Sequence, residues 1–439
     1  MQMRQLEGLS LRALLFGTFL LALLLRLAFL SIKPLAWSHQ LQAGDEPLYH
    51  GLAINLMRGE GYVFEGEPRS YPPPLHPLFI AAVYRVVGIS PPAVRVMQAV
   101  LGSLLCMLIA WWAAAIWGKR AGLFAGVVAA LYYPFLQLPL YLMTENLYLP
   151  LFMAAAMMTW RLGDWTNRRN ELGSPLRRQS GAHLWVKALL AGVLWGLAVL
   201  TREIARGAFF LALLWAIVRT RWQKTFLLFV ATLVVTLPWS IRNRAVFRAP
   251  SQSSAQIVQV PKQPLWMRLL PGGLLYMSFG PPGTEPRILG HWNWGSDVRR
   301  PEEPPNLPQT ERDRWLKEQA LAYIRANPTE AIVQRIPRKL ANLLTPFYGT
   351  ASLPNKVLTT FCYLLLLALS LPAWWQAWRS QDLAERRLAE LVLLIATFTF
   401  VFHTVFYGVV RYRYPIDALL LVFSGKSLKD LAGRLFVCG

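Results

Sequence analysis

Long apolar runs constrain this chain more than any other feature of its sequence. A helix that crosses a bilayer needs about 20 mostly apolar residues. About ten runs approach or reach that length, at roughly 12–32, 92–117, 121–138, 141–160, 185–201, 207–219, 224–239, 355–378, 388–409 and 413–424. The sequence therefore predicts an all-α polytopic membrane protein with about ten transmembrane helices.

Composition supports this class and excludes others. Of the 439 residues, 55% are hydrophobic and 15% are charged, against about 25% charged in soluble domains. So few charges cannot coat several soluble globules, and disorder requires low hydrophobicity. The formal net charge is nevertheless +22. Nucleic-acid binding would need a basic face on a soluble module, and none is evident in the sequence.

Basic residues between the runs set the predicted orientation, because cytoplasmic loops are rich in Lys and Arg. With the N-terminus in the cytoplasm, every even-numbered crossing ends at a basic cluster. The first run is too long for a signal-peptide core and is expected to stay as an anchor. We expect a multi-pass inner (plasma) membrane protein with both termini cytoplasmic. The inner clusters contain Lys119, Arg120, Arg161, Arg168, Arg169, Arg177, Arg178, Arg219, Arg221, Lys224, Arg379, Arg386, Arg387, Lys426, Lys429 and Arg434.

Two long segments then face outward, at 33–91 and 240–345. The chain divides accordingly into an N-terminal transmembrane module (1–239), an extracytoplasmic loop region (240–345) and C-terminal transmembrane helices (346–439). Short helices are expected within the two outer segments, and a Pro-, Gly- and Ser-rich stretch is expected to be irregular. The helices are predicted at 47–57, 75–88, 311–326 and 329–344, the last an amphipathic helix suited to the membrane interface, and the irregular stretch at 249–310.

Acidic side chains mark two places at the predicted outer face. Asp45 and Glu46 lie just beyond the first run, where they suit a general base and a helper. The alternative is a helix-capping Asp with a first-turn Glu. Glu145 lies at the outer end of the fourth run, where an acid is costly and suggests function. Its alternative is an interfacial carboxylate that touches headgroup water.

Arginines mark three further places at the same face. Arg202 follows the fifth run and suits an anionic group, or else an ion network with Glu203 and Arg206. Arg242, after Pro238-Trp239, suits a phosphate, or else snorkels to the interface. The segment from Arg411 to Pro415 interleaves two arginines with two tyrosines, and its alternative role is an aromatic–basic anchor. Their shared location predicts a site that binds an anion and performs acid–base chemistry.

Other chemistries have little support in the sequence. There is no G-x-G-x-x-G phosphate loop and no D-x-D triplet. The six histidines are too scattered for a zinc motif, and Cys106, Cys362 and Cys438 have no short spacing. His76 lies in the Pro-rich part of the first outer segment, where a structural role is the simpler interpretation. No cofactor is predicted with certainty, and dependence on a divalent metal is left open.

An ordered set of short motifs resembles the GT-C membrane glycosyltransferases. The nearest branch is the bacterial one related to protein O-mannosyltransferases and the lipid A aminoarabinose transferase. The likeness covers about residues 10–425 and weakens over 250–310. The motifs that carry it are Gly44-Asp45-Glu46, Gly59 to Tyr62, Pro73-Pro74-Leu75-His76-Pro77, Thr144-Glu145, Leu200-Thr201-Arg202, Pro238-Trp239 with Arg242-Asn243, and Arg411-Tyr412-Arg413-Tyr414-Pro415.

The resemblance implies a polyprenyl-phosphate sugar donor, an outer-face active site and inversion of the anomeric centre. It implies that Asp45 is the catalytic base, and that Glu46 and Glu145 are acids beside the sugars. Pro72 stands where the aminoarabinose branch has a lysine, and Arg69 is a substitute cation. By the same resemblance, the donor-phosphate candidates are Arg69, Arg202, Arg242, Arg411 and Arg413, and further pocket candidates are Tyr62 and His76.

Two classes of function follow from these features. The first is an inverting glycosyltransferase whose partners are the bilayer, the lipid-linked sugar and a glycan, lipid or protein acceptor. The second is a transporter or flippase of anionic lipid-linked substrates, which intramembrane charge would also suit. Transporters of that kind often contain repeats, and the sequence shows none. A scaffold without chemistry leaves the acidic first outer segment unexplained.

Overall fold

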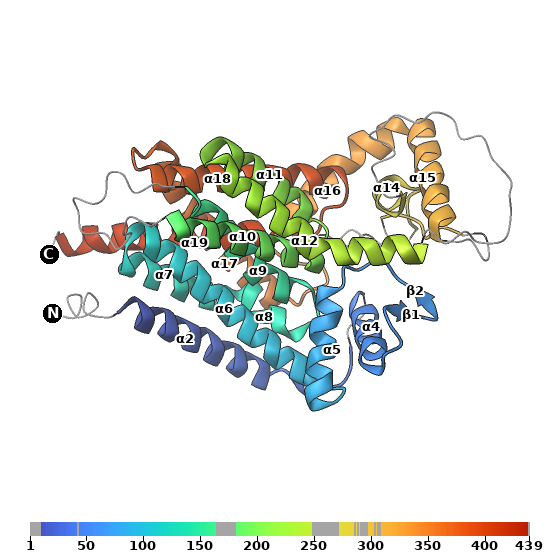
Figure 1. Cartoon of the computed structure of the whole chain (residues 1–439), viewed down its shortest axis with the longest axis horizontal. Helices are drawn as coiled ribbons and strands as arrows, with labels where there is room; N and C mark the ends of the chain where they lie inside the picture. Colours follow the sequence, from blue (N-terminus) through green and yellow to red (C-terminus); the bar gives the residue numbers. More distant parts are fainter. Residues whose placement is uncertain are drawn as a thin grey trace. The chain divides into compact units, whose positions relative to one another are not determined.

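The computed structural model describes residues 10–41, 44–163, 181–247, 272–284, 287, 289, 297–302, 304 and 309–437. Helices make up nearly all of the regular structure in these ranges (Figure 1). The elements are α2 (Leu11–Ser31), α3 (Pro34–Trp37), α4 (Glu46–Arg58), β1 (Val63–Phe64), β2 (Glu67–Pro68), α5 (Leu75–Val87), α6 (Pro91–Trp117), α7 (Lys119–Leu131), α8 (Tyr133–Gln137), η1 (Leu138–Leu140), α9 (Glu145–Trp160), α10 (Gly181–Thr201), α11 (Ala205–Arg219), α12 (Trp222–Phe247), α14 (Gly272–Phe279), α15 (Gln309–Ala326), the π-helix η2 (Thr329–Gln334), α16 (Arg335–Leu344), α17 (Leu353–Arg379), α18 (Leu383–Val405), η3 (Val410–Arg413) and α19 (Tyr414–Val437).

Several of the long helices are apolar enough to cross a membrane. Six qualify by length and composition, or seven if the bent pair Lys119–Leu131 and Tyr133–Leu140 counts as one span. The helices α9 and α11, of 16 and 15 residues, are shorter than the roughly 20 residues that a span takes. A multi-pass membrane protein is therefore confirmed, and the predicted ten crossings stay a prediction.

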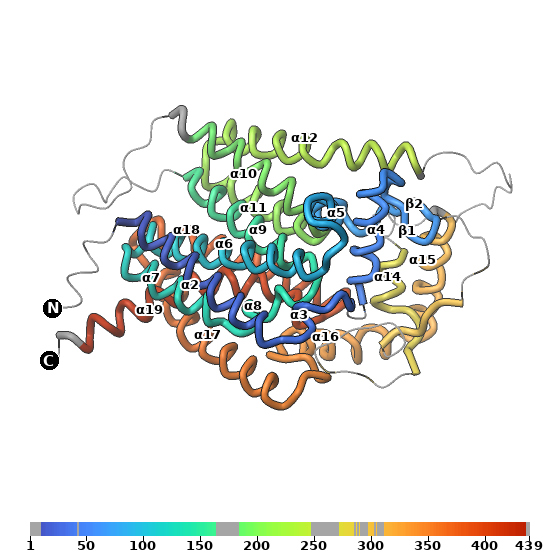
Figure 2. Tube along the Cα trace, turned by 90° about the horizontal axis from the view of Figure 1, so that it is seen from below, coloured from blue at the N-terminus to red at the C-terminus, as the bar shows by residue number. Residues whose placement is uncertain are grey.

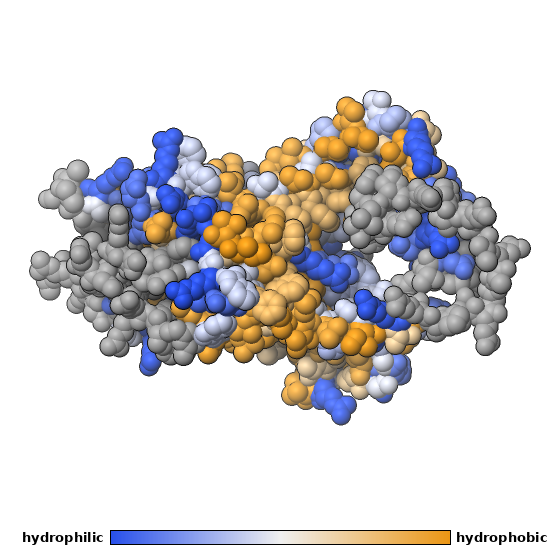
Figure 3. All heavy atoms as spheres, turned by 45° about the horizontal axis from the view of Figure 1, so that its top comes forward, coloured by the Kyte–Doolittle hydropathy of each residue, from blue (hydrophilic) through white to orange (hydrophobic). Residues whose placement is uncertain are grey.

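The outward faces of these helices are apolar. Leu24, Phe229 and Val234 are 66%, 37% and 62% exposed, and apolar side chains form a broad patch on the face shown in Figure 3. Exposed apolar patches of this kind mark an interaction surface. Because the helices that carry them are long enough to span a bilayer, lipid is the medium that covers them.

The chain divides into two compact units. The first comprises Met1–Trp239, Phe361–Ala396 and Tyr414–Gly439, and the second comprises Ser240–Thr360 and Thr397–Arg413. In the first unit, α6 packs against α2, α7, α9 and α19, and α2 runs alongside α6 and α7 in both ribbon views (Figures 1 and 2). Small residues permit this approach, since a Cβ on Gly122 would lie 2.8 Å from the carbonyl oxygen of Ala110.

The first outer segment folds as two short helices joined by a hairpin. Helix α4 ends at Gly59, whose left-handed φ of 81° requires no side chain. Strands β1 and β2 pair antiparallel, with Val63 opposite Pro68. Helices α4 and α5 pack together around Tyr49, Ala53, Ile80 and Tyr84, and the buried Leu142 joins the same core. This core connects the first outer segment to the start of α9.

The second unit has its own core. Helix α14 packs against α15, and Leu275, Tyr276 and Ala320 are buried between them. In α16, Arg335 and Lys339 are 2% and 0% exposed, although the amphipathic pattern predicted an interfacial helix with a basic face. Burial and the nearby Arg335 and Arg338 lower the pKa of Lys339 to about 6.

The helices predicted from sequence were largely correct in type and differ in their bounds. Helices predicted at 47–57, 75–88 and 311–326 are confirmed as α4, α5 and α15. The predicted run 121–138 is broken at Tyr132, whose backbone is extended, because Pro134 has no N–H to continue the helical hydrogen bonds and lies in the first turn of α8. The two halves bend by 57°. The prediction of irregular structure at 249–310 is wrong over Gly272–Phe279, because these residues form α14. Much of the rest of that stretch lies outside the described residues.

Candidate active site

Asp45 and Glu46 are adjacent in sequence but have different surroundings. Glu46 is fully buried, and its Oε1 accepts a hydrogen bond of 3.3 Å from the backbone N–H of Leu142. Asp45 is half-buried and occupies the N-cap position of α4, yet its side chain makes no capping hydrogen bond. The capping interpretation of Asp45 is therefore wrong, and of this pair Asp45 is the carboxylate that solvent reaches.

His76 binds the same peptide segment as Glu46. Its Nε2 lies 3.2 Å from the carbonyl oxygen of Leu142, and since a carbonyl only accepts, Nε2 carries the proton. The ring is fully buried and meets the ring of Tyr49 edge-on at 5.0 Å. Burial lowers the pKa of His76 to about 4. His76 is thus a neutral structural histidine, as the simpler interpretation of the sequence held.

A second acid lies three residues after Leu142, at the start of α9. Glu145 forms an ion pair with Arg202, and their side chains are 3% and 14% exposed. Arg202 also donates to the hydroxyl of Thr144 at 3.0 Å, and its guanidinium lies 5.8 Å from the ring centre of Tyr148. The interfacial alternative for Glu145 is wrong, because its carboxylate is buried and paired with an arginine.

Part of the ion network proposed as the alternative for Arg202 is present. Glu203 forms an ion pair with Arg206 at 3.9 Å, and their side chains are 45% and 61% exposed. Arg202 itself pairs with Glu145, which joins the end of α10 to the start of α9. The charges of Glu145 and Arg202 both shift the pKa of His76, in opposite directions. The side chains of Glu145, Arg202 and His76 therefore interact electrostatically.

Two further candidates in the first outer segment make contacts that hold this segment together. The Tyr62 hydroxyl donates to the carbonyl of Pro72 at 2.7 Å, and its ring packs edge-on against Trp239 at 4.9 Å. Arg69 donates to the carbonyl of Phe64 at 3.2 Å and lies 3.4 Å from the carboxylate of Glu65. Roles for Tyr62 and Arg69 in substrate binding stay predictions.

The remaining arginine candidates belong to the second unit. Arg242 donates to the side chain of Asn243 at 2.9 Å. The guanidinium of Arg411 lies 5.6 Å from the ring centre of Tyr412. Arg413 is 1% exposed and donates to three carbonyl groups at the end of α16, those of Leu343, Leu344 and Thr345, at 3.0 to 3.2 Å. Arg413 therefore stabilises a helix C-terminus.

The sequence reasoning missed residues that shape this region. Arg95 is fully buried in α6 and donates to the carbonyls of Leu35, Ser38 and Gln40 at 2.6 to 2.8 Å. It thereby fixes the chain that leads to Asp45. The available signal was an arginine inside a predicted transmembrane run, which suggests a specific role. The sequence gives no comparable signal for Leu142, because nearly any residue supplies a backbone N–H and C=O.

A metal site would need several His, Cys, Asp or Glu side chains close together. Among the residues that the structure describes, no three His, Cys, Asp or Glu side chains gather closely enough to hold a metal ion. Of the three candidate carboxylates, Asp45 is half-buried, whereas Glu46 and Glu145 are buried. An accessible carboxylate held on a helix end can accept a proton from a hydroxyl group.

Comparison with solved structures identifies the architecture. Cupriavidus metallidurans ArnT bound to undecaprenyl phosphate matches over 94% of this chain and 60% of that one, with 14% identity and a TM-score of 0.56. The Archaeoglobus fulgidus oligosaccharyltransferase AglB, in complex with an inhibitory peptide and a dolichol-phosphate, matches over 97% of this chain and 51% of that one, with 14% identity and a TM-score of 0.53. The chain has the fold of ArnT and of AglB.

This shared fold confirms the resemblance to the lipid A aminoarabinose transferase that the sequence motifs predicted. The chain spans between half and two thirds of the length of these solved structures. No protein-family description matches the sequence, and no curated protein does either. The likeness to ArnT and AglB is consequently one of three-dimensional structure.

Proposed function

We propose that the protein transfers a sugar from a polyprenyl-phosphate carrier to an acceptor hydroxyl at the outer face of the membrane, with inversion at the anomeric carbon. The observation that carries this proposal is that Asp45 is half-buried, so that solvent reaches its carboxylate, whereas Glu46 is fully buried. The fold supports it, because ArnT, which shares that fold, has been crystallised with undecaprenyl phosphate.

In the proposed reaction, the acceptor oxygen attacks C1 of the sugar while Asp45 takes the hydroxyl proton. The bond between C1 and the phosphate oxygen breaks, and its electron pair leaves with the polyprenyl phosphate. A positioned general base contributes about 10²–10⁴-fold to such a step. Glu46 accepts a hydrogen bond from the backbone of Leu142, and Glu145 forms an ion pair with Arg202. We therefore assign these two acids to positioning and to electrostatic support rather than to proton transfer.

The leaving phosphate needs nearby positive charge, which preorganised donors supply most effectively. Arg202 belongs to the same unit as Asp45, and its pairing with Glu145 holds its guanidinium in place. We therefore propose Arg202 as the cation of this unit that supports the reaction. Arg242, Arg411 and Arg413 lie in the second unit and stay predictions for phosphate binding.

The proposal is tested with the full chain reconstituted in liposomes. Polyprenyl-phosphate sugars labelled in the sugar are supplied together with envelope lipids, glycans or peptides as acceptors. We expect labelled acceptor and free polyprenyl phosphate to appear in equal amounts, and the product linkage to have the opposite anomeric configuration to the donor. Movement of an intact labelled carrier across the bilayer, with no cleavage, would support the transporter alternative and refute the transferase.

A further inference from the structure

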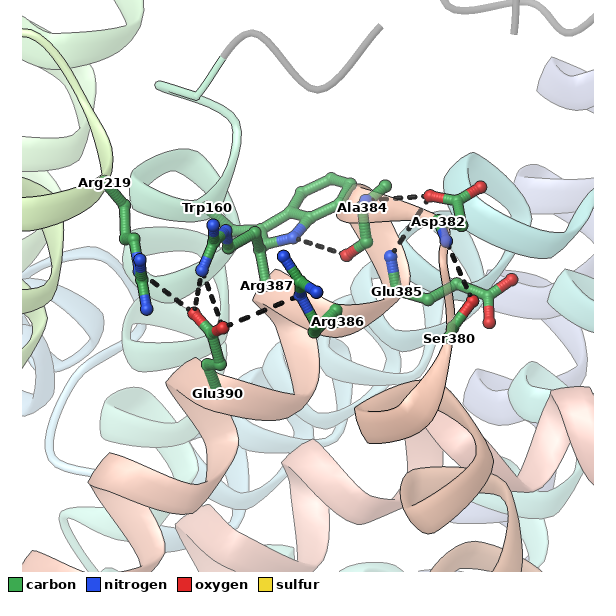
Figure 4. Close-up of polar contacts among 9 residues, drawn as sticks. All are labelled: Trp160, Arg219, Ser380, Asp382, Ala384, Glu385, Arg386, Arg387 and Glu390. Atoms are coloured by element: carbon green, nitrogen blue, oxygen red, sulfur yellow. Dashed lines mark hydrogen bonds and ion pairs between the residues drawn. The ribbon is translucent and has the colours of Figure 1, made fainter. Parts of the chain in front are cut away.

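Three arginines surround the carboxylate of Glu390 in the first unit. They lie at the end of this unit where α11 ends and α18 begins. Arg387 donates to both oxygens of Glu390, at 2.6 and 2.7 Å. Arg219 at the end of α11 lies 3.1 Å from the same carboxylate, and Arg386 lies 4.0 Å from it. Figure 4 shows the arginine side chains pointing toward Glu390 from α11 and α18. Three cations therefore share one anion.

The cluster is held in place by its surroundings. The indole N–H of Trp160, the last residue of α9, donates to the carbonyl of Ala384 at 3.2 Å. Asp382 accepts the N–H of Ala384 at 2.8 Å and so begins α18. Glu385, further along α18, forms an ion pair with Lys426 at 3.9 Å. Glu390 is the acid that pairs with all three arginines, so one negative charge meets three positive ones.

Two of the arginines have donors to spare. The side chains of Arg219 and Arg386 are 35% and 40% exposed. Within the described ranges of the chain, each has Glu390 as its one ion-pair partner. A guanidinium has several N–H donors in a fixed plane that matches a phosphate group. One carboxylate shared among three arginines does not satisfy all of them.

An exposed apolar side chain follows the cluster along α18, and another is adjacent to it in α11. Arg386, Glu390 and Leu394 follow each other at four-residue spacing and lie on one face of α18, where Leu394 is 38% exposed. On α11, Val218 precedes Arg219 and is 72% exposed. A positively charged group above exposed apolar side chains matches the two parts of a phospholipid, its phosphate and its acyl chains.

The cluster is separate from the candidate active site. Glu145 begins α9, and Trp160 ends it, so the two lie about 22 Å apart along the helix at 1.5 Å per residue. On the predicted topology this end faces the cytoplasm. We propose that Arg219 and Arg386, organised by Glu390, bind the phosphate of an anionic phospholipid of the inner leaflet, with its acyl chains along Val218 and Leu394. Basic pockets between transmembrane helices bind anionic headgroups in this way.

Native mass spectrometry of the detergent-purified full chain tests this site. The protein is incubated with equal amounts of phosphatidylglycerol and phosphatidylcholine of identical acyl chains, and the retained lipids are counted. We expect the wild type to retain phosphatidylglycerol preferentially. The Arg219→Gln/Arg386→Gln variant should lose that preference by about tenfold or more, because each basic residue at a membrane surface adds about fivefold in affinity for anionic lipid.

Matched variants make the result decisive. Arg12→Gln removes an exposed arginine from the start of α2 and should retain the preference. Arg219→Lys/Arg386→Lys keeps the charge and should restore most of it, which also controls for misfolding of the glutamine variant. Wild-type preference in the glutamine variant, or an equal loss in Arg12→Gln, would overturn the proposal. Displacement of the lipid by millimolar inorganic phosphate would overturn its assignment to a phospholipid. None of these measurements depends on the proposed transferase activity.

Discussion

Glu46 and His76 bind the backbone N–H and the C=O of one residue, Leu142. Glu46 accepts the N–H at 3.3 Å, and His76 donates to the C=O at 3.2 Å. Since Glu145 follows Leu142 by three residues, these two contacts fix the segment that carries the second acid of the site. They also couple the first outer segment, which contains Asp45, to the start of α9.

The neutrality of His76 makes stability depend on pH. Its pKa of about 4 in the folded protein lies below the ordinary value of 6.5. Between these values the unfolded chain binds a proton that the folded chain does not, so stability falls as pH is lowered from 6.5 to 4. The loss is about 1.4 kcal/mol per pH unit at most.

Thermal unfolding of the detergent-purified protein between pH 7 and pH 4 checks this prediction. The matched variant is His76→Asn, which keeps a side-chain donor but does not titrate. We expect a shallower decline of Tm with falling pH in His76→Asn than in the wild type. Parallel curves for the two proteins would show that His76 titrates in the folded state near its ordinary pKa.

Glu145 and Arg202 are expected to stabilise the fold only as a pair. Arg202→Gln leaves a buried carboxylate without its cation, and breaking a buried pair in this way costs about 3–5 kcal/mol. Glu145→Gln/Arg202→Gln removes both charges and should recover much of that loss. A double-mutant cycle on Tm measures the coupling between the two residues. Additive effects of the two single substitutions would contradict the pairing.

Arg413 and Arg411 are expected to differ although they lie two residues apart. Arg413→Ala removes a buried cation from three carbonyls at the end of α16 and should lower stability by about 1.5–3 kcal/mol. Arg411 is less buried than Arg413, and its guanidinium lies over the ring of Tyr412, so Arg411→Ala should lower Tm less. Equal shifts of Tm would refute a specific capping role for Arg413.

Much of the fold follows from patterns that the sequence displays directly. Apolar runs locate the long helices, and Gly59 and Pro74 mark where α4 ends and α5 begins. The helix at Gly272–Phe279 escaped prediction because Gly and Pro surround it, and its stability comes from packing against α15. Tertiary contacts of this kind override local propensity.

The candidate site was predictable in its residues but not in their roles. Asp45, Glu46, Glu145 and Arg202 all drew notice as charges at helix ends. The sequence could not show that Glu46 is buried while Asp45 is accessible, because adjacent residues on a helix point in different directions. Nor could the sequence show that Arg202 pairs with Glu145, which is distant in the chain, since that pairing depends on how α9 and α10 pack.

The central claim is that Asp45 takes the acceptor proton. Its most direct test compares Asp45→Asn with Glu60→Gln, which removes an exposed carboxylate from the same outer segment, in liposomes supplied with a labelled polyprenyl-phosphate sugar. We expect the turnover of Asp45→Asn to fall by about 10²–10⁴-fold with an unchanged Tm, and Glu60→Gln to match the wild type. Turnover of Asp45→Asn within a few-fold of the wild type would contradict the claim.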